Sequence, residues 1–440
     1  MKARILSVLF VIVLVSSLAF TADEDGFVPL FNGKDLSGWI PVNVAPDTFT
    51  VQDGMIICSG LPTGVMRTAK LYENFIFEVE WRHMKVGGNS GIFMWGDALT
   101  AAGTPFARAI EVQVLDHGYG KSDWFTTHGD VFAIHGATMK PFPPSKGMRS
   151  FPTEHLSKGS PEWNHYRIEC NNGTVKLSVN GKQVSGGENC KPRKGHICLE
   201  SEGGIVHFRN LRIKELPSTG ATAEETSRAN DGIPLSDVEG FTNLYTGKDF
   251  AGWKWDAGHK GHWKAQDWVL DYDGKSEAAD KSLWTEKEYG DFVLITDWRW
   301  TRKPVEKEVP VILPNGDQNG AAKVPDAGDS GIYLRGNSKS QVNIWCWPIG
   351  SGEVYGYRTD SAMSAEVRAG VTPKVKADKP IGEWNRFVIT MKGDRLTVFL
   401  NGKLVIENAQ LPSVPARGPI ALQHHGDPIQ FANILIKELK

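Results

Sequence analysis

Hydrophobic and polar residues alternate in short runs along most of the chain, which is the period-2 pattern of half-buried β-strands. Phe75 to Arg82, Thr174 to Val179, Gly195 to Glu200, Val206 to Ile213 and Arg395 to Leu400 are such runs. The second and the last of them lead into Asn-Gly, the preferred two-residue hairpin turn, because both turn positions need positive φ. No helical period longer than about ten residues stands out. The pattern therefore predicts an all-β protein built from short strands.

The first 22 residues have a different pattern. Lys2 and Arg4 precede an apolar run from Ile5 to Phe20, and small residues follow at Ala19 and Ala22. This order is typical of a secretory signal peptide. The run is shorter than the roughly 20 apolar residues that a membrane span needs, although an uncleaved anchor helix stays an alternative. We expect a secreted or periplasmic protein with no membrane association after cleavage of residues 1–22.

The rest of the chain repeats itself once. Six short blocks recur in the same order after about 215 to 240 residues, a period far longer than that of solenoid repeats. The paired blocks begin at Phe27 and Phe241, Phe75 and Phe292, Asn89 and Asp329, Glu162 and Glu383, Val179 and Leu400, and Phe208 and Phe431. The repeat predicts two copies of one antiparallel β-sandwich, at residues 23–216 and 241–440. A linker rich in Ser, Thr, Ala and Gly joins them at residues 217–240.

Composition narrows the function classes. The 440 residues suffice for two or three domains, and a net charge of −2 with 23% charged residues excludes a strongly basic nucleic-acid binder. Export would permit disulfides, and four of the five cysteines lie in the first copy, where two bridges have three connectivities. Buried free thiols are the alternative. The cysteines are Cys58, Cys170, Cys190, Cys198 and Cys346.

The repeated blocks resemble the 3-keto-disaccharide hydrolase domain family. The block from Phe27 to Trp39 reads Phe-Val-Pro-Leu-Phe-Asn-Gly-Lys-Asp-Leu-Ser-Gly-Trp, and Gly-Asn-Ser-Gly-Ile-Phe and Glu-Val-Gln-Val-Leu-Asp follow at 88–93 and 111–116. The resemblance covers both copies. It implies two tandem concanavalin A-like jelly-roll sandwiches and an exported enzyme that hydrolyses the glycosidic bond of 3-keto-glycosides, such as oligosaccharides. It also implies a separate sugar 3-dehydrogenase that supplies the oxidised sugar.

A ketone at C3 acidifies the proton at C2, so one base can start an elimination that expels the C1 substituent, and water then adds to the enone. Period 2 puts Glu111 and Gln113 on one face of the strand predicted at Ala109 to Asp116, and Glu111 is the first choice for the base. Gln113 and Arg82 are candidates for stabilising the enolate oxygen. His117 and His135 are candidates for acid or base because an unperturbed imidazole titrates near neutral pH.

Other interpretations of the first copy stay open. Asp116 keeps a conventional β-glucanase-like glycosidase in play, although a retaining mechanism needs two carboxylates about 5–5.5 Å apart and Gln113 supplies none. A non-catalytic, lectin-like protein of two glycan-binding modules is the other alternative. Asp116 and the nearby histidines match no standard metal-site spacing. No cofactor is certain, and a divalent metal ion is left open.

The second copy lacks the carboxylates, since Gln341, Asn343 and Cys346 align with Glu111, Gln113 and Asp116. We therefore expect catalysis in the first copy, with the second binding glycan or acting in parallel through a histidine base. The candidate substrate-binding residues are Asn89, Ser90, Trp95 and Glu202 in the first copy and Arg335, Gln341, Asn343, Trp345, His424 and His425 in the second.

Tryptophan is unusually frequent and unevenly shared, with five of 15 residues in the first copy and ten in the second. Aromatic rings suit stacking on pyranose rings and also core packing. Three repeated pairs are predicted to be core residues: Trp39 and Trp253, Trp81 and Trp298, and Trp163 and Trp384. The unmatched residues are the candidates for sugar stacking: Trp255, Trp263, Trp268, Trp284, Trp300, Trp345 and Trp347.

Overall fold

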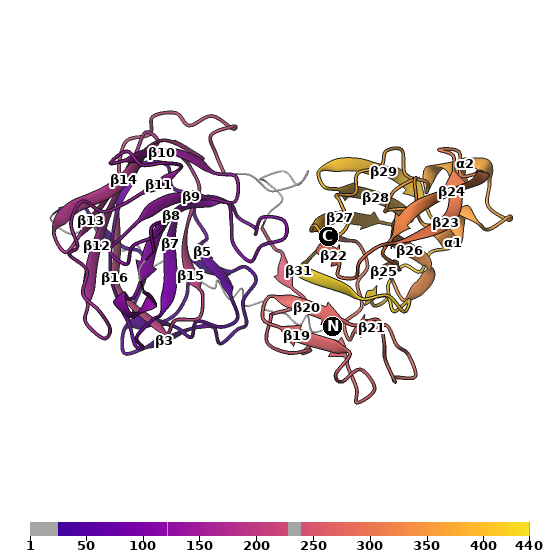
Figure 1. The fold of residues 1–440 in the computed structure, drawn as a ribbon, viewed down its shortest axis with the longest axis horizontal. Helices are drawn as coiled ribbons and strands as arrows, with labels where there is room; N and C mark the ends of the chain where they lie inside the picture. The colour runs from indigo at the N-terminus through magenta and orange to yellow at the C-terminus, as the bar shows by residue number, and fades with distance from the viewer. Residues whose placement is uncertain (1–24, 121, 228–238, 440) are drawn as a thin grey trace, which may run out of the picture.

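The computed structural model describes residues 25–120, 122–227 and 239–439, which form two β-sandwiches side by side (Figure 1). The predicted signal peptide lies outside the described residues. Within these ranges, the molecule has no helix with the length and apolar character needed to cross a membrane. The prediction of an all-β fold is confirmed.

The first sandwich packs a nine-stranded sheet against a seven-stranded sheet. The larger sheet has the order β10-β14-β13-β12-β6-β16-β4-β3, with β1 paired to β16, and the smaller one has the order β11-β9-β8-β7-β15-β5-β2. A short 3₁₀ helix, η1 (His117–Tyr119), follows β8. The strands are β1 (Val28–Pro29), β2 (Trp39–Pro41), β3 (Phe49–Gln52), β4 (Met55–Cys58), β5 (Gly64–Thr68), β6 (Phe75–His83), β7 (Asn89–Gly96), β8 (Ala109–Leu115), β9 (Val131–Ile134), β10 (Thr138–Phe142), β11 (Arg149–Ser150), β12 (Asn164–Asn171), β13 (Thr174–Val179), β14 (Lys182–Lys191), β15 (His196–Ser201) and β16 (Val206–Glu215).

The second sandwich repeats this plan with an eight-stranded and a five-stranded sheet. Their orders are β19-β20-β31-β22-β27-β28-β29, with β17 paired to β31, and β18-β21-β30-β25-β26, and a separate hairpin joins β23 to β24. The elements are β17 (Thr242–Asn243), β18 (Trp253–Lys254), β19 (Trp263–Gln266), β20 (Val269–Tyr272), β21 (Leu283–Thr285), β22 (Phe292–Trp300), β23 (Val305–Ile312), β24 (Gln318–Asp326), β25 (Asp329–Leu334), β26 (Asn337–Trp345), α1 (Tyr355–Arg358), α2 (Ala365–Gly370), β27 (Asn385–Lys392), β28 (Arg395–Leu400), β29 (Lys403–Gln410), β30 (Ala421–Leu422) and β31 (Ile429–Glu438).

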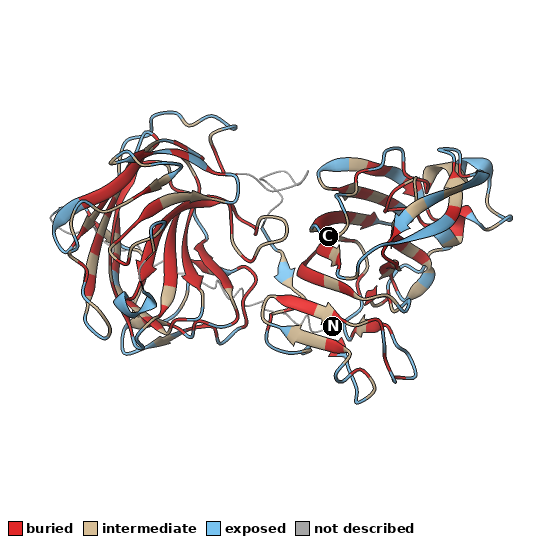
Figure 2. Cartoon of the chain, in the orientation of Figure 1, coloured by how far each residue is buried: buried red, intermediate tan, exposed pale blue. Residues whose placement is uncertain are grey.

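The alternating runs form strands because one face of each enters a sandwich core. In β13, for example, Val175, Leu177 and Val179 are fully buried while the residues between them are partly exposed. The hairpin that follows turns at Asn180 and Gly181, with φ of 48° and 94°, as a type I′ turn requires. In Figure 2 buried residues lie mainly along the strands of both sandwiches, and exposed residues lie mainly in the turns and loops between them.

The tryptophan pairs divide differently from the prediction. The first two pairs are core residues, but Trp163 and Trp384 are only half-buried, and the prediction for this pair is wrong. The Arg82 and Arg209 guanidinium groups lie 4.5 and 3.9 Å from the Trp163 ring. Among the unmatched tryptophans, Trp263 is a core residue stacked on Tyr272 at 3.9 Å, so it is not available to a sugar.

All five cysteines are free thiols, and the expectation of disulfide bridges is not met. Four are buried in the first sandwich and Cys346 is partly buried in the second. Burial raises the pKa of the Cys58 thiol to about 11 and that of Cys198 to about 12, which keeps both uncharged and unreactive.

The two sandwiches contact each other through a loop of the first and a sheet face of the second. Ala98 and Leu99, in the loop of residues 97–108, pack against Ile295, Val388 and Leu435. At the matching positions of the first sandwich, strand pairing brings Glu78, Arg167 and Arg212 together as ion pairs instead.

Polar contacts close this interface. Arg386 and Asp297 form a buried ion pair, with 2.6 Å between Nε and Oδ1. Asp297 accepts a hydrogen bond from Gly103 N–H, and Arg386 donates one to Thr100 O. The equivalent face of the first sandwich is charged and cannot bury an apolar loop of this kind. The contact therefore forms in one direction only, with the loop of the first sandwich on the face of the second.

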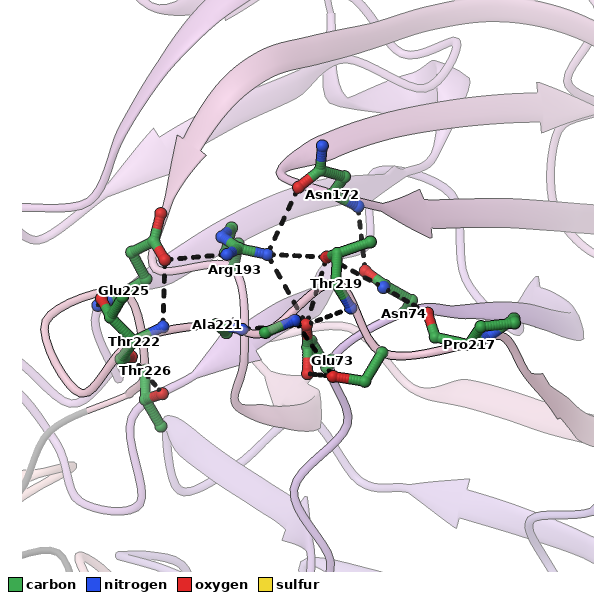
Figure 3. A network of polar contacts seen from close by, with 12 residues as sticks. Glu73, Asn74, Asn172, Arg193, Pro217, Thr219, Ala221, Thr222, Glu225 and Thr226 are labelled. Carbon is green, nitrogen blue, oxygen red and sulfur yellow. Dashed lines mark hydrogen bonds and ion pairs between the residues drawn. The ribbon is translucent and has the colours of Figure 1, made fainter.

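The described part of the predicted linker, up to Ser227, folds back onto the first sandwich. Glu73 accepts hydrogen bonds from the backbone N–H groups of Thr219 and Ala221, and Arg193 bonds to Thr219 and to Glu225 (Figure 3). Although burial opposes the charge, these bonds hold the pKa of Glu73 at about 2, so the carboxylate stays ionised.

Candidate functional site

Two carboxyl groups meet on the outer face of the seven-stranded sheet. Glu111 on β8 and Glu200 on β15 flank the central strand β7, and Gly91 on β7 faces Gln113 across the ladder. A β-carbon at Gly91 would lie 2.7 Å from Glu200 Oε2 and 2.9 Å from Glu111 Oε1. The absence of a side chain at Gly91 therefore makes room for both carboxyl groups above one point of the sheet.

Both groups are held in their protonated form. Burial and then the negative charge of Glu202 raise the pKa of Glu111 to about 8, while the Arg149 guanidinium opposes the shift. Burial raises the pKa of Glu200 well above its ordinary value, and its neighbours Glu111 and Glu202 add to the effect. Glu200 Oε2 is buried and has no hydrogen-bond partner among the described residues.

Glu202 completes a set of three carboxyl groups. It follows β15 directly, is partly exposed, and accepts a hydrogen bond from Asn89 Nδ2. Asn89 Oδ1 in turn accepts from Gln113 Nε2 at 2.9 Å. Burial raises the pKa of Glu202 to about 7, although the Asn89 hydrogen bond lowers it.

An arginine and two aromatic rings border the carboxyl groups on the β9 side. Phe132 pairs with Glu111 in the ladder, and the Arg149 guanidinium lies 3.4 Å from the Phe132 ring and 5.6 Å from that of Trp124. Arg149 also bonds to Asp130 at 2.9 Å. Trp124 is 67% exposed, the most exposed large aromatic residue among those described, and such a ring suits stacking on a sugar.

Several predicted catalytic residues lie away from this face. Asp116 Oδ2 accepts from the backbone N–H groups of Gly87 and Gly118 at 2.7 and 2.8 Å. Although burial opposes it, these bonds and one from Ser160 lower the pKa of Asp116. Asp116 thus organises the turn around η1. His117 bonds to Ser157 Oγ at 2.9 Å in the same loop region.

His135 and Arg82 also contact other groups. His135 packs against the Phe106 ring at 6.0 Å, bonds to Thr104, and burial lowers its pKa. Arg82 lies on β6 in the opposite sheet, beside Trp163 and His207, so the sandwich core separates it from Glu111. The prediction that Arg82 acts with Glu111 is wrong because the two strands belong to different sheets.

Two predicted binding residues of the first sandwich point inward. Ser90 is fully buried and donates to Glu200 O at 2.8 Å. Trp95 is also fully buried and donates from Nε1 to Glu73 O at 2.8 Å. The predicted sugar contact of these two residues is not met. Period 2 turns Ser90 to the face opposite Gly91, and Trp95 enters the core at a positive φ of 57°, where the pairing of β7 with β15 shifts register.

In the second sandwich, two amides replace the two acids. Gln341 and Gln423 occupy the positions of Glu111 and Glu200, and Gln341 Nε2 donates to Gln423 Oε1 at 2.6 Å. A β-carbon at Gly331 would lie 2.4 Å from Gln341 Nε2, which matches the arrangement around Gly91. The second copy thus keeps the arrangement of the pair, with amides in place of the titratable carboxyl groups.

The other predicted residues of the second copy divide between core and surface. Arg335 is buried and bonds to Gly290 O, Gly393 O and Asp291, so it holds loops together and does not reach a ligand. Trp345 is buried and stacked on Trp347 at 4.0 Å, and the prediction that it contacts sugar is not met either.

The remaining three predicted residues of the second copy lie on or near the face with the amide pair. Asn343 is buried opposite Gly331, and its Oδ1 has no partner among the described residues. His424 bonds to the Tyr272 hydroxyl, and His425 is exposed beside Asp329. Burial raises the pKa of Asp329 to about 6, while His425 opposes the shift.

Metal and cavity geometry add two facts. Within the described ranges, no group of three His, Cys, Asp or Glu side chains is arranged to hold a metal ion, and the divalent ion stays a prediction. A cavity of about 730 Å³ lies over the opposite sheet and is lined by Glu78 and Glu80, which form ion pairs with arginines. Although burial opposes it, hydrogen bonds from Arg167 and Arg212 lower the pKa of Glu78.

The sequence analysis missed Glu200, Arg149, Trp124 and the role of Gly91. For Glu200 a signal existed, since it aligns with Gln423 just as Glu111 aligns with Gln341. The matched exchange of two acids for two amides would have indicated a pair. Arg149 lies on the two-residue strand β11 and Trp124 in a turn, and neither has an equivalent block in the second copy.

The fold and this face define an all-β protein of two tandem sandwiches with a buried carboxyl pair on one sheet of the first. The chain belongs to the family described as "3-keto-alpha-glucoside-1,2-lyase-like domain", which it matches at residues 26–214 and again at 240–437. The two matches correspond to the two sandwiches.

Individual proteins with similar sequence or structure are more distant. A protein of Bacteroides thetaiotaomicron named 3-keto-disaccharide hydrolase is 26% identical over 253 residues, which are 46% of this chain and 82% of that protein. A crystal structure from Parabacteroides distasonis, provisionally assigned as a glycosyl hydrolase, is 22% identical with a TM-score of 0.34, covering 44% of this chain and 95% of its own. A β-glucanase of Bacillus licheniformis is 13% identical with a TM-score of 0.29, covering 43% of this chain and 97% of its own.

Proposed function

We propose that the first sandwich hydrolyses the glycosidic bond of 3-keto-glycosides by elimination and hydration, at the face formed by Glu111, Glu200 and Glu202. The observation that carries this proposal is the carboxyl pair above Gly91, buried, protonated and next to a third carboxyl group that is partly exposed. The family described as lyase-like and the relative named a 3-keto-disaccharide hydrolase support the substrate class.

Exposure assigns the roles, because Glu202 is partly exposed while Glu111 and Glu200 are buried. Glu202, with a pKa of about 7, is the base that removes the C2 proton. Glu111, with a pKa of about 8, still holds the proton that the leaving oxygen needs. Protonated Glu200 and the Arg149 guanidinium donate to the C3 oxygen, where negative charge develops in the enolate. The sequence-based choice of Glu111 as base is the competing assignment.

The bond changes balance without a cofactor. The C2–H electron pair becomes the C2=C3 bond of an enolate, which re-forms the ketone as the C1–O bond breaks and Glu111 protonates the departing oxygen. Water then adds to C1 of the enone while Glu111 takes its proton, and Glu202 returns its proton to C2. The products are the free aglycone or sugar and the 3-keto sugar.

The pH dependence of kcat/KM follows from these roles. The rate should rise as Glu202 loses its proton near pH 7 and fall as Glu111 loses its proton near pH 8, which gives a narrow bell. Glu202→Gln should remove the acidic limb together with nearly all activity, and Glu111→Gln should remove the alkaline limb.

Exchange of the C2 proton with deuterated solvent tests the roles separately from turnover. We expect Glu202→Gln to lose exchange of a 3-keto-disaccharide and Glu111→Gln to keep exchange while sugar release falls by a factor of about 10² or more. The opposite pattern would make Glu111 the base. Gln341→Glu is the matched control, since it changes the equivalent position in the second copy and should leave sugar release unchanged.

A conventional glycosidase is the second candidate, because the structure places a second carboxyl group, that of Glu200, next to Glu111. Gln113 has no carboxyl group and could not take this place. Its nucleophile would have to be ionised, which the raised pKa values of both Glu111 and Glu200 oppose. Release of monosaccharide from an unoxidised disaccharide would favour this alternative, and binding of both sugars without release would favour a lectin-like role.

The proposed substrate requires a partner reaction and a location. An oxidation of the sugar at C3 by a dehydrogenase must precede this step, since the chain itself carries no dinucleotide fingerprint. We also propose export, on the pattern of residues 1–22. Amino-terminal sequencing of the mature protein, with a start near Asp23, is the measurement that checks it.

A further inference from the structure

A cavity of about 340 Å³ opens in the second sandwich over β18 and β21. In the five-stranded sheet, β30 and β25 lie between β21 and β26, and β26 carries Gln341. The cavity is therefore separate from the face with the amide pair. Its size is at the lower end of the roughly 300–1,000 Å³ of small-molecule sites. The lining residues are Lys254, Asp256, His259, Asp280, Ser282 and Trp284, with Gly336 and Pro419 at one end.

This cavity exists because the second copy lacks a covering loop. In the first sandwich, residues 97–108 join β7 to β8, and Phe106 of this loop packs edge-on against Phe93 at 6.0 Å. In the second, Arg335 and Gly336 alone join β25 to β26. Tyr333, at the position of Phe93, is therefore left partly exposed.

Trp284 forms an aromatic wall at this opening. Strand pairing places it at the position of Arg67, whose side chain in the first sandwich is buried under the loop and bonds to Ala98 O at 2.9 Å. The Trp284 ring rests on Tyr333 at 5.5 Å, and its Nε1 donates to Asp280 Oδ2 at 2.7 Å. These two contacts fix the orientation of the ring.

A buried ring nitrogen without a partner lines the same cavity. His259 is only 3% exposed, and its Nδ1 lies 3.2 Å from both the backbone N and the Oδ1 of Asp256. Nε2 has no hydrogen-bond partner among the described residues. A buried polar atom of this kind costs free energy unless a ligand pairs with it.

We propose that this cavity binds one pyranose ring of a carbohydrate, with a face of the sugar on Trp284 and hydroxyl groups on His259 Nε2, Asp256 and Asp280. An aromatic face beside carboxylates and an unpartnered imidazole nitrogen matches the apolar face and vicinal hydroxyls of a pyranose. The carbohydrate class rests on the proposed function, but the site is distinct from the carboxyl pair. It would hold a glycan without cleaving it.

Calorimetric titration of the full chain carrying Glu111→Gln tests the proposal, with cellobiose, maltose and trehalose as probes. We expect at least one disaccharide to bind, Trp284→Ala to weaken that binding roughly tenfold or more, and Trp284→Phe to restore most of it. Trp255→Ala is the control, because Trp255 is exposed and stacked on Phe250 at 5.4 Å outside the cavity lining.

A second variant guards against a local folding effect. Asp256→Asn alters an exposed cavity residue and should weaken binding with an unchanged melting temperature. Binding that is equal in Trp284→Ala, Asp256→Asn and the parent, or absent from the parent at millimolar sugar, would overturn the proposal. Binding is measured in the Glu111→Gln chain and needs no turnover, so this test and that of the carboxyl pair fail independently.

Discussion

At the residue scale, a glycine determines how close the two acids can come. Gly91→Ala would put a β-carbon within 3 Å of both carboxyl groups. We expect sugar release to fall at least tenfold and the free energy of unfolding to fall by about 1–3 kcal/mol. Gly331→Ala is the matched control because it crowds Gln341 in the second sandwich. It should cost similar stability, measured by urea unfolding, and leave sugar release intact. Equal activity loss in both variants would contradict this role.

Glu111 also links stability to pH. Its pKa in the folded protein, about 8, lies above the ordinary value of 4.5, so the folded state binds more protons between these values and stability falls as pH rises. Glu111→Gln removes this loss. We expect the melting temperature of the variant to match that of the parent near pH 5 and to exceed it at pH 9. A parent that gains stability relative to the variant over this range would show that the carboxyl group is ionised when folded.

At the element scale, the alternating pattern predicted individual strands well. β13 and β28 begin and end at the predicted residues, since their period and their Asn-Gly turns are local features. The same period correctly assigned Glu111 and Gln113 to one face of β8. It could not bring Glu200 to that face, because strand order in a sheet depends on contacts between segments far apart in the sequence. The loop of residues 97–108 likewise has no periodic pattern from which its position could be predicted.

This loop carries a testable role of its own. Leu99 is 4% exposed against Ile295 and its neighbours, so Leu99→Asp buries an unpaired charge between the sandwiches. We expect the sandwiches to separate, with a larger radius of gyration in solution scattering. Val86→Asp, at a residue that is 76% exposed, is the control and should change nothing. An unchanged scattering profile in Leu99→Asp would show that the interface tolerates the charge.

At the scale of the whole molecule, hydrophobic burial without disulfides stabilises both sandwiches. Each has its own core, built from the inward residues of two sheets. The unfolded protein should react with five equivalents of a thiol reagent, and a reductant should leave the melting temperature unchanged. Fewer reactive thiols, or a reductant-sensitive melting temperature, would mean that a disulfide forms in the exported protein.

The sequence by itself determined the all-β class, the two copies and the family, because these depend on local period, turn residues and repeated blocks. It also placed Glu111 and Gln113 on one face. The tertiary structure decided which residues meet there. Strand order places Glu200 next to Glu111 and puts Arg82 in the other sheet. The loop of residues 97–108 covers a sheet face in the first sandwich, and the second sandwich, which lacks this loop, has the cavity beside Trp284. Side chains distant in sequence approach each other only when the sheets are assembled, so no local pattern encodes these contacts.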